Sequence, residues 1–256
     1  MNKSAYWETY IKYWQKRVKE ANVCGDGALD KMPDDAIMER YIYWLNSHLN
    51  TPKGAVLDYG CGFGRAYPYF ETLGVKYYGC DIANACIQAT LTSYPQIPKQ
   101  RVKKLKANEC IPFRDNTFSG VFCYGVFDAC NQALTLSEIL RVLKIGGVAL
   151  ITGKNDTYLE SDEMAMVAEI GARNNNHPNF FTNTQALLYI LQSRNITILE
   201  SRFFLWRKDN ATDTFTTTLP PKFYTYALLI QKAEDSILGA FESFSDSYSQ
   251  NFKALH

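Results

Sequence analysis

Hydrophobic positions in the central part of the chain follow two different periods. Short apolar runs at 55–58, 75–80, 121–124 and 147–152 predict buried strands, and the alternating apolar and basic residues of 101–106 predict an edge strand. Between these runs, residues 64–73, 83–93 and 133–143 show the spacing of three to four residues that is typical of helices. Strands that alternate with helices in this way predict βαβ units and a parallel sheet.

The two ends of the chain extend this pattern. Helical spacing at 4–21 and 34–49 predicts an N-terminal helical lid over residues 1–50. A helix at 184–193 and two strands at 196–205 and 223–231, paired as an antiparallel hairpin, complete a core at 51–232. Residues 154–181 lack a clear period and are interpreted as a substrate-binding insertion. Large apolar residues every three to four positions predict a C-terminal amphipathic helix at 233–256, packed on this chain or on a second copy.

Composition limits the partners. The 256 residues are 46% hydrophobic with a net charge of +1, which suits one α/β domain and does not indicate binding to nucleic acid or to an anionic membrane. Seven cysteines without a C-x-x-C pair suggest neither a disulfide framework nor a metal site, and they fit a reducing cytoplasm. No segment has the core of a signal peptide or the length of a membrane span. We therefore expect a cytoplasmic protein, monomeric or dimeric through its C-terminal helix, with a small-molecule substrate.

A glycine-rich loop follows the first core strand. Gly60, Gly62 and Gly64 stand between a predicted strand and a predicted helix, where glycine allows a sharp turn and a close approach of the backbone to a ligand. The dinucleotide fingerprint is G-x-G-x-x-G, whereas Arg65 occupies the place of its third glycine here. The chain also has no G-x-x-x-x-G-K-[ST] phosphate loop. The spacing thus argues against a nicotinamide oxidoreductase.

Two acidic residues accompany this loop. Asp58, at the end of the strand, is unsuited to a pyrophosphate but suits a ligand that carries an ammonium group and a sulfonium. Asp81 follows Asp58 by 23 residues and ends the next strand, a position that suits contact with ribose hydroxyls. Asp81 can also serve as the cap of the helix that starts near Ala83, and the two roles are compatible.

Four segments in order resemble the class I S-adenosylmethionine-dependent methyltransferases. They are the glycine loop at 56–64, Tyr78-Gly-Cys-Asp-Ile82, Ile111-Pro-Phe-Arg-Asp-Asn-Thr-Phe118 and Glu138-Ile-Leu-Arg-Val-Leu-Lys-Ile-Gly-Gly147. The resemblance runs from about residue 54 to 153 and continues more weakly to 231. It implies a Rossmann-like α/β fold: a seven-stranded, mostly parallel sheet with helices on both faces and the last strand antiparallel. It also implies S-adenosyl-L-methionine as cofactor, with S-adenosyl-L-homocysteine as product.

The resemblance assigns cofactor contacts to Asp58, Gly60, Cys61, Gly62, Gly64, Asp81, Ile82, Asn108, Glu109, Cys123 and Tyr124. Within this set, the loop residues would line the methionine part, and Asp81 would bind the ribose hydroxyls. Ile82 and one of Asn108 and Glu109 would lie at the adenine. Cys123 and Tyr124 would face the sulfur.

Residues for the methyl acceptor are expected outside the shared core. His177 in the insertion and Asp128, which stands where many relatives have Glu in a Glu-His pair, are candidates for a general base. Lys154 and Asn155 follow the last parallel strand, at the sheet edge where open α/β sheets bind ligands, and Lys154 is a candidate to hold an anionic group. A lid is expected from an aromatic stripe of the first helix, comprising Tyr6, Trp7, Tyr10 and Trp14, for which a core-packing role is the alternative.

These observations favour methyl transfer to O or N of a small metabolite. The resemblance extends to compact bacterial methyltransferases, some of which modify cell-surface sugars or their phosphorylated precursors, so a capsule or polysaccharide precursor is one hypothesis for the acceptor. A protein or RNA methyltransferase and a cofactor-binding protein without catalysis are the alternatives.

Overall fold

A computed structural model of the chain describes residues 12, 35–106, 110–174, 177 and 179–253. Its larger elements are α2 (Asp35–Ser47), β1 (Ala55–Tyr59), α3 (Tyr67–Thr72), β2 (Lys76–Asp81), α4 (Asn84–Ser93), β3 (Val102–Lys104), β4 (Phe118–Cys123), α5 (Gln132–Val142), β5 (Leu143–Lys154), α6 (Glu163–Asn174), α7 (Thr184–Ser193), β7 (Ile196–Phe204) and β8 (Thr225–Lys232). Short elements are the 3-10 helices η1 (Lys99–Arg101) and η2 (Phe127–Ala129), the strands β6 (Phe181–Thr182) and β9 (Ser245–Asp246), and the helices α8 (Asp209–Thr212) and α9 (Gln250–Lys253).

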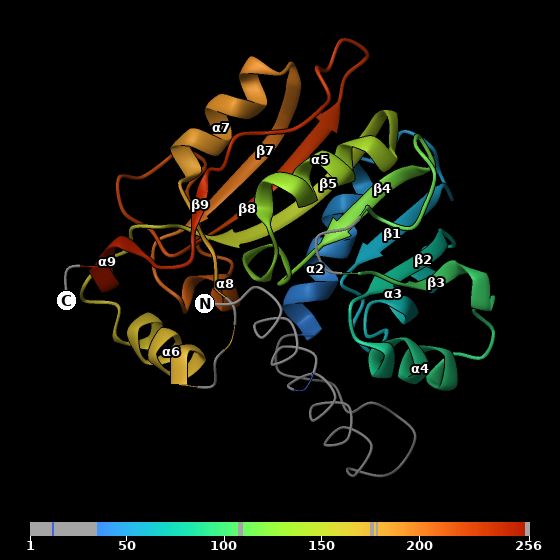
Figure 1. Ribbon diagram of the computed structural model, residues 1–256, viewed down its shortest axis with the longest axis horizontal. Helices are drawn as coiled ribbons and strands as arrows, with labels where there is room; N and C mark the ends of the chain where they lie inside the picture. Colours follow the sequence, from blue (N-terminus) through green and yellow to red (C-terminus); the bar gives the residue numbers. More distant parts are fainter. Residues whose placement is uncertain (1–11, 13–34, 107–109, 175–176, 178, 254–256) are drawn as a thin grey trace.

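The main sheet has seven strands in the order β3-β2-β1-β4-β5-β8-β7. Strands β3, β2, β1, β4 and β5 pair in parallel, and β8 is antiparallel to both of its neighbours. This arrangement confirms the predicted fold class, the hairpin of the last two strands and the edge position of the strand at 101–106. The carboxyl ends of the parallel strands lie together at the edge of the sheet that faces α6 (Figure 1).

Helices cover both faces of the sheet, because successive residues of each strand point to opposite sides. Leu57 of β1 and Ile151 of β5 belong to the core under α5 and α7. Val56 and Leu150, one position earlier, belong to the core under α2, α3 and α4. In Figure 1, α5 and α7 lie in front of the sheet and α2 lies behind it.

Local signals explain where several helices begin. The side chains of Asn131 and Asn183 accept hydrogen bonds from backbone N–H groups in the first turns of α5 and α7, as expected of N-cap residues. Asp162 does the same for α6, with its Oδ1 3.0 Å from the backbone nitrogen of Ala165. The stretch interpreted from sequence as irregular therefore contains a helix of 12 residues. Its Asp162 was the available start signal.

The predicted C-terminal helix at 233–256 is wrong over 233–249, where the chain runs without helix and forms strand β9 against β6. Its serines favour local bonds from side chain to backbone over helix; Ser243, for example, donates to the carbonyl of Ser245 at 3.3 Å. Phe244 is buried against Phe127, with ring centroids 6.4 Å apart. Ile237 and Tyr248, in contrast, are exposed, so the apolar residues of this segment do not share one helical face. The helix through which a dimer was expected is therefore absent over 233–249.

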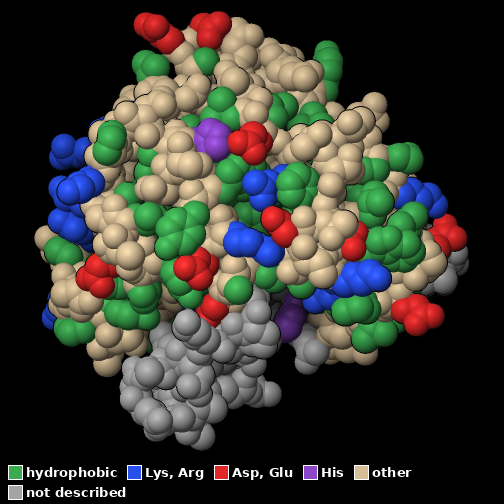
Figure 2. Space-filling view, turned by 180° about the vertical axis from the view of Figure 1, so that it is seen from behind, with side chains coloured by type: hydrophobic (Ala, Val, Ile, Leu, Met, Phe, Trp, Pro, Cys, Tyr) green, Lys and Arg blue, Asp and Glu red, His purple; other side chains and the backbone are tan. Residues whose placement is uncertain are grey.

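Among the residues that the structure describes, none of the helices combines the length and apolar character needed to cross a membrane. On the face shown in Figure 2, acidic and basic side chains are interspersed among apolar ones, apart from a group of basic residues at one edge.

Candidate cofactor and acceptor site

The glycine loop turns sharply at the carboxyl end of β1. The backbone N–H groups of Gly60 and Cys61 both donate to the carbonyl of Cys80, at 2.8 and 3.0 Å, which ties the loop to β2. Gly60, Gly62 and Gly64 have positive φ angles of 74°, 54° and 83°, a region that favours glycine.

The three glycines have different neighbours. A Cβ atom on Gly60 would lie 2.6 Å from the side chain of Val126, and one on Gly64 would lie 2.8 Å from Thr90, so internal packing demands glycine at both positions. A Cβ atom on Gly62 would meet no heavy atom of the described residues within 4 Å. The loop therefore borders open space at Gly62.

Asp81 joins the loop to the next helix. Its Oδ2 accepts from the backbone N–H of Gly62 at 2.9 Å, and its Oδ1 accepts from that of Ala83 at 2.7 Å. Burial raises the pKa of Asp81 to about 6, although the backbone hydrogen bonds from Ala83 and Gly62 oppose this change. The carboxyl group thus has the helix-start role foreseen for it, and it also lies beside the open position of the loop.

Asp58 is the second buried carboxyl group here. It accepts a hydrogen bond of 2.9 Å from the hydroxyl of Tyr77. Burial raises its pKa to about 7; the bond from Tyr77 opposes this change and the charge of Asp81 adds to it. A cation bound beside this pair would favour the ionised carboxylates.

The end of β4 also borders open space. Cys123 is buried in the core, whereas Tyr124 is partly exposed and its ring lies between those of Tyr41 and Phe122, with centroids 5.3 and 5.7 Å away. Gly125 follows with a φ of 66°, and a Cβ atom there would meet no heavy atom of the described residues within 4 Å. The backbone N–H of Gly125 donates to Thr152 on β5 at 2.8 Å.

Three predicted catalytic residues, distant in sequence, converge beyond this edge. Lys154, at the end of β5, forms an ion pair of 3.3 Å with Asp128 of η2. His177 follows α6, and its backbone N–H donates to the carbonyl of Ala172 at 2.8 Å. Burial and then the charge of Lys154 lower the pKa of His177, which keeps its imidazole neutral at pH 7.

Sequence reasoning missed further members of this cluster. Glu169 of α6 lies 2.9 Å from Lys154 and accepts a hydrogen bond of 2.5 Å from the hydroxyl of Tyr224. Burial would lower the pKa of Lys154, but the charges of Asp128, Tyr224 and Glu169 raise it overall, so its side chain is an ammonium ion. Glu169 gave no signal in the sequence, because only the fold of α6 brings it to β5.

The comparisons with known proteins agree with this geometry. Residues 57–151 match a family model described as a methyltransferase domain. An uncharacterised protein of Methanocaldococcus jannaschii is 31% identical over 132 residues, which are 51% of this chain and 54% of that protein. This chain therefore spans about half the length of the curated relative that it matches.

Two solved structures have the same fold. A geranyl diphosphate C-methyltransferase from Streptomyces coelicolor, in complex with Mg²⁺, geranyl diphosphate and S-adenosyl-L-homocysteine, has 15% identity and a TM-score of 0.58 over 89% of this chain and 98% of that one. A methyltransferase from Aquifex aeolicus that depends on S-adenosylmethionine has 15% identity and a TM-score of 0.55 over 86% and 98%.

Residues 57–151 are a methyltransferase domain. The family match confirms the prediction from the glycine loop and the three later segments, including the S-adenosylmethionine that this family uses.

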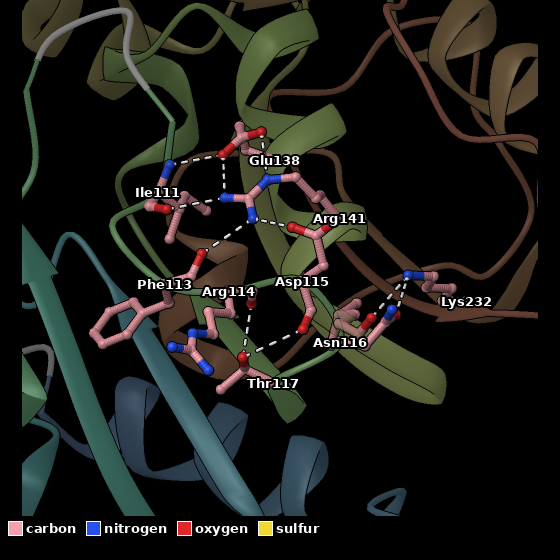
Figure 3. Close-up of polar contacts among 10 residues, drawn as sticks. Ile111, Phe113, Arg114, Asp115, Asn116, Thr117, Glu138, Arg141 and Lys232 are labelled. Atoms are coloured by element: carbon pink, nitrogen blue, oxygen red, sulfur yellow. Dashed lines mark hydrogen bonds and ion pairs between the residues drawn. The ribbon is translucent and has the colours of Figure 1, made fainter.

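Two of the segments that carried the resemblance meet at one side chain of the methyltransferase domain (Figure 3). Arg141 donates to both carboxylate oxygens of Glu138 at 2.8 and 2.6 Å, and Glu138 accepts from the backbone N–H of Ile111 at 2.7 Å. Arg141 also donates to the carbonyls of Ile111 and Phe113, at 2.9 and 3.0 Å, and to Asp115 at 2.5 Å. These motif residues hold the connection to β4 in place; within the described residues they make no contact with the glycine loop.

The structure changes the role of other predicted site residues. Asn155 is buried and bonded internally, accepting from Thr184 at 2.8 Å and donating to the carbonyl of Thr157 at 2.6 Å, so it fixes β5 to α7 and is not exposed to an acceptor. Arg65 forms an ion pair with Asp35 at the start of α2.

Of the remaining predicted site residues, some are described by the structure and others are not. Cys61 is buried and Ile82 is partly buried, both beside the loop. The predicted contacts Asn108 and Glu109 and the predicted lid residues Tyr6, Trp7, Tyr10 and Trp14 lie outside the described residues.

Proposed function

We propose that the protein transfers the methyl group of S-adenosylmethionine to an oxygen or nitrogen atom of a small molecule. The observation that carries the proposal is the loop of the methyltransferase domain. There, the open position at Gly62 lies beside the buried carboxyl groups of Asp58 and Asp81.

The carboxyl groups of Asp58 and Asp81 fit the cofactor. Burial is the main cause of the raised pKa values of both carboxyl groups, so their ionised forms are disfavoured here without a nearby cation. A ligand with an ammonium and a sulfonium group would supply that positive charge. In this proposal Asp81 binds the ribose hydroxyls and Ile82 lies against the adenine. The loop from Asp58 to Gly64 lines the methionine part.

Two groups of residues complete the proposed cofactor site. Cys123 and Tyr124, at the end of β4, lie on the side of the sulfur. Asn108 or Glu109 lies near the adenine amino group. This assignment follows the family resemblance, and the substitutions described below test its central member, Asp81.

When bound, S-adenosylmethionine supplies an activated methyl group, so the residues of this chain mainly align donor and acceptor. Such alignment contributes roughly 7–11 kcal/mol in favourable cases. The acceptor's lone pair forms the bond to the methyl carbon while the carbon–sulfur bond breaks and its electrons remain on sulfur. Asp128 accepts the proton that a hydroxyl or amine acceptor releases.

Several features support a small acceptor. The chain is nearly neutral overall, with 27 basic and 26 acidic residues, and the charges are mixed on the face drawn in Figure 2. The Streptomyces structure that shares the fold holds geranyl diphosphate, a small molecule. A sugar-type or phosphorylated precursor of a cell-surface glycan is the finer hypothesis, based on the resemblance to compact bacterial methyltransferases.

The test is methyl transfer from methyl-labelled S-adenosylmethionine into a cell extract divided by ultrafiltration into small molecules and macromolecules. We expect label in the small-molecule fraction, and a loss of transfer in Asp81→Asn. Asp235→Asn is the matched control, because Asp235 is exposed and follows β8, whose last residues pair with the part of β5 that is distant from Lys154. Label only in protein or RNA would contradict a small acceptor, and tight cofactor binding without transfer to any fraction would indicate a binding protein without catalysis.

A further inference from the structure

The ammonium group of Lys154 is enclosed by polar atoms of this chain. An ammonium carries three donors, and Lys154 has three acceptors: Asp128 at 3.3 Å, Glu169 at 2.9 Å and the side-chain oxygen of Asn179 at 3.1 Å. Its charge is also exceeded by those of its two carboxylate partners. The prediction that Lys154 grips an anionic substrate therefore conflicts with the arrangement of the site.

Both carboxylate oxygens of Glu169 also have partners inside the protein. Its Oε1 accepts from Lys154 and from Tyr224, its Oε2 accepts from Asn179 at 2.6 Å, and its side chain is only 1% exposed. These contacts come from α6, β5 and the residues just before β6 and β8. These contacts fix the side chains of Lys154 and Glu169, and Asp128 is the member of the cluster that they leave accessible.

Asp128 retains an open oxygen. Its Oδ2 pairs with Lys154, and its Oδ1 has no hydrogen bond or ion pair to any residue in the described part of the chain. The Asp128 side chain is 16% exposed, and η2 begins two residues after Gly125, where the end of β4 borders open space. Asp128 thus offers a carboxylate oxygen, which accepts hydrogen bonds and repels anions.

We propose that this cluster selects an acceptor that presents a hydroxyl or amine donor to Asp128 and carries no anionic group there. Lys154 is a positioning residue that holds Asp128 and Glu169 in place. The inference rests on the proposed function and narrows it: an uncharged polyol or an amine is favoured over a phosphorylated or carboxylated acceptor.

Inorganic phosphate is the first probe, and its binding does not depend on methyl transfer. Phosphorus NMR line broadening measures its binding to the full chain with S-adenosyl-L-homocysteine present. We expect the wild type and Lys154→Met to give the same result. Asp128→Asn/Glu169→Gln, which leaves the ammonium without carboxylate partners, should bind phosphate at least about tenfold more tightly, the equivalent of one charge-assisted hydrogen bond. Adding Lys154→Met should remove that gain.

Wild-type phosphate binding that Lys154→Met weakens by about tenfold would overturn the inference, as would a folded double variant that gains no phosphate affinity. Circular dichroism establishes folding. If the double variant does not fold, Asp128→Asn alone replaces it, because the bonds of Glu169 to Tyr224 and Asn179 stay intact in that variant.

The second measurement uses labelled small molecules separated on an anion exchanger. We expect the methylated product in the unretained fraction; product retained as an anion would overturn the inference. Lys154→Met should lower kcat/KM for this acceptor while the Kd of S-adenosylmethionine stays unchanged, and Lys154→Arg should restore part of the loss. Absence of transfer in every fraction counts against the proposed function, and the phosphate experiment then decides the inference alone.

Discussion

Replacing Arg141 by Met should destabilise the protein far more than replacing its neighbour Arg114. Arg141 makes five hydrogen bonds to four groups of the 111–115 segment and of α5, and its side chain is 26% exposed. Its partner Glu138 has a side chain that is 9% exposed and would keep only its bond from the backbone of Ile111.

Breaking a buried ion pair by removal of one partner costs about 3–5 kcal/mol. Because water can reach part of Arg141, we expect the lower end, about 3 kcal/mol. At roughly 2–4 °C for each kcal/mol in a chain of this size, the Tm should fall by about 6–12 °C. Arg141→Lys keeps the charge but loses the planar fork, so it should recover only part of this loss.

Thermal melts followed by circular dichroism and urea unfolding measure both effects. Arg114 is the control: it is exposed, and its side chain makes no hydrogen bond or ion pair in the described part of the chain, so Arg114→Met should change stability by less than about 0.5 kcal/mol. Glu138→Met/Arg141→Met should cost less than the sum of the single changes, because no charge is left buried without its partner. Equal stability of Arg141→Met and Arg114→Met would refute the reasoning, and so would strict additivity of the double change.

Three further predictions follow from other parts of the structure. Because Asp58 and Asp81 have raised pKa values of about 7 and 6, the ligand-free protein should lose stability as pH rises from about 4 to 7. Over the same range S-adenosylmethionine should bind more tightly, and its binding should release protons. Calorimetry in buffers of different ionisation enthalpy measures the protons exchanged, and uptake of protons would contradict the prediction. Gly60→Ala should lower the Tm more than Gly62→Ala, since only Gly60 packs against a side chain, whereas Gly62→Ala should mainly weaken cofactor binding; the reverse order of Tm would be inconsistent with the loop described above. Phe244→Ala should cost about 3 kcal/mol in urea unfolding, because the ring is buried against the core, and a loss under about 1 kcal/mol would refute that packing.

Much of the fold could be predicted because local patterns determined it. The strand before Gly60, the edge strand with its alternating lysines and the helix at 184–193 each follow from periodicity over a short window, and the structure has all three. The helix predicted for the C-terminal segment was wrong because that prediction relied on local periodicity alone. The prediction weighed large apolar residues at helical spacing and left out Ser243 and the other serines of the segment, which favour bonds to nearby backbone over helix.

The candidate site was predictable only in part. The residue types at Asp58, Gly62 and Asp81 indicated the cofactor because their chemistry is local to one loop and the end of the next strand. The environment of Lys154 could not be predicted from local sequence, because it depends on Glu169, which α6 brings to the end of β5. A single lysine at a sheet edge predicts an anion site, whereas the two carboxylate partners of Lys154 are the basis of our proposal that the site excludes anions.

Calorimetry of S-adenosylmethionine binding tests the central claim most directly. We predict one site per chain, with Asp81→Asn weakening the affinity by at least about tenfold, the effect of removing one charged hydrogen-bond acceptor. Asp235→Asn should bind as the wild type does, and NADH should not compete. Absence of S-adenosylmethionine binding by the folded wild type, or equal affinity in Asp81→Asn, would contradict the account.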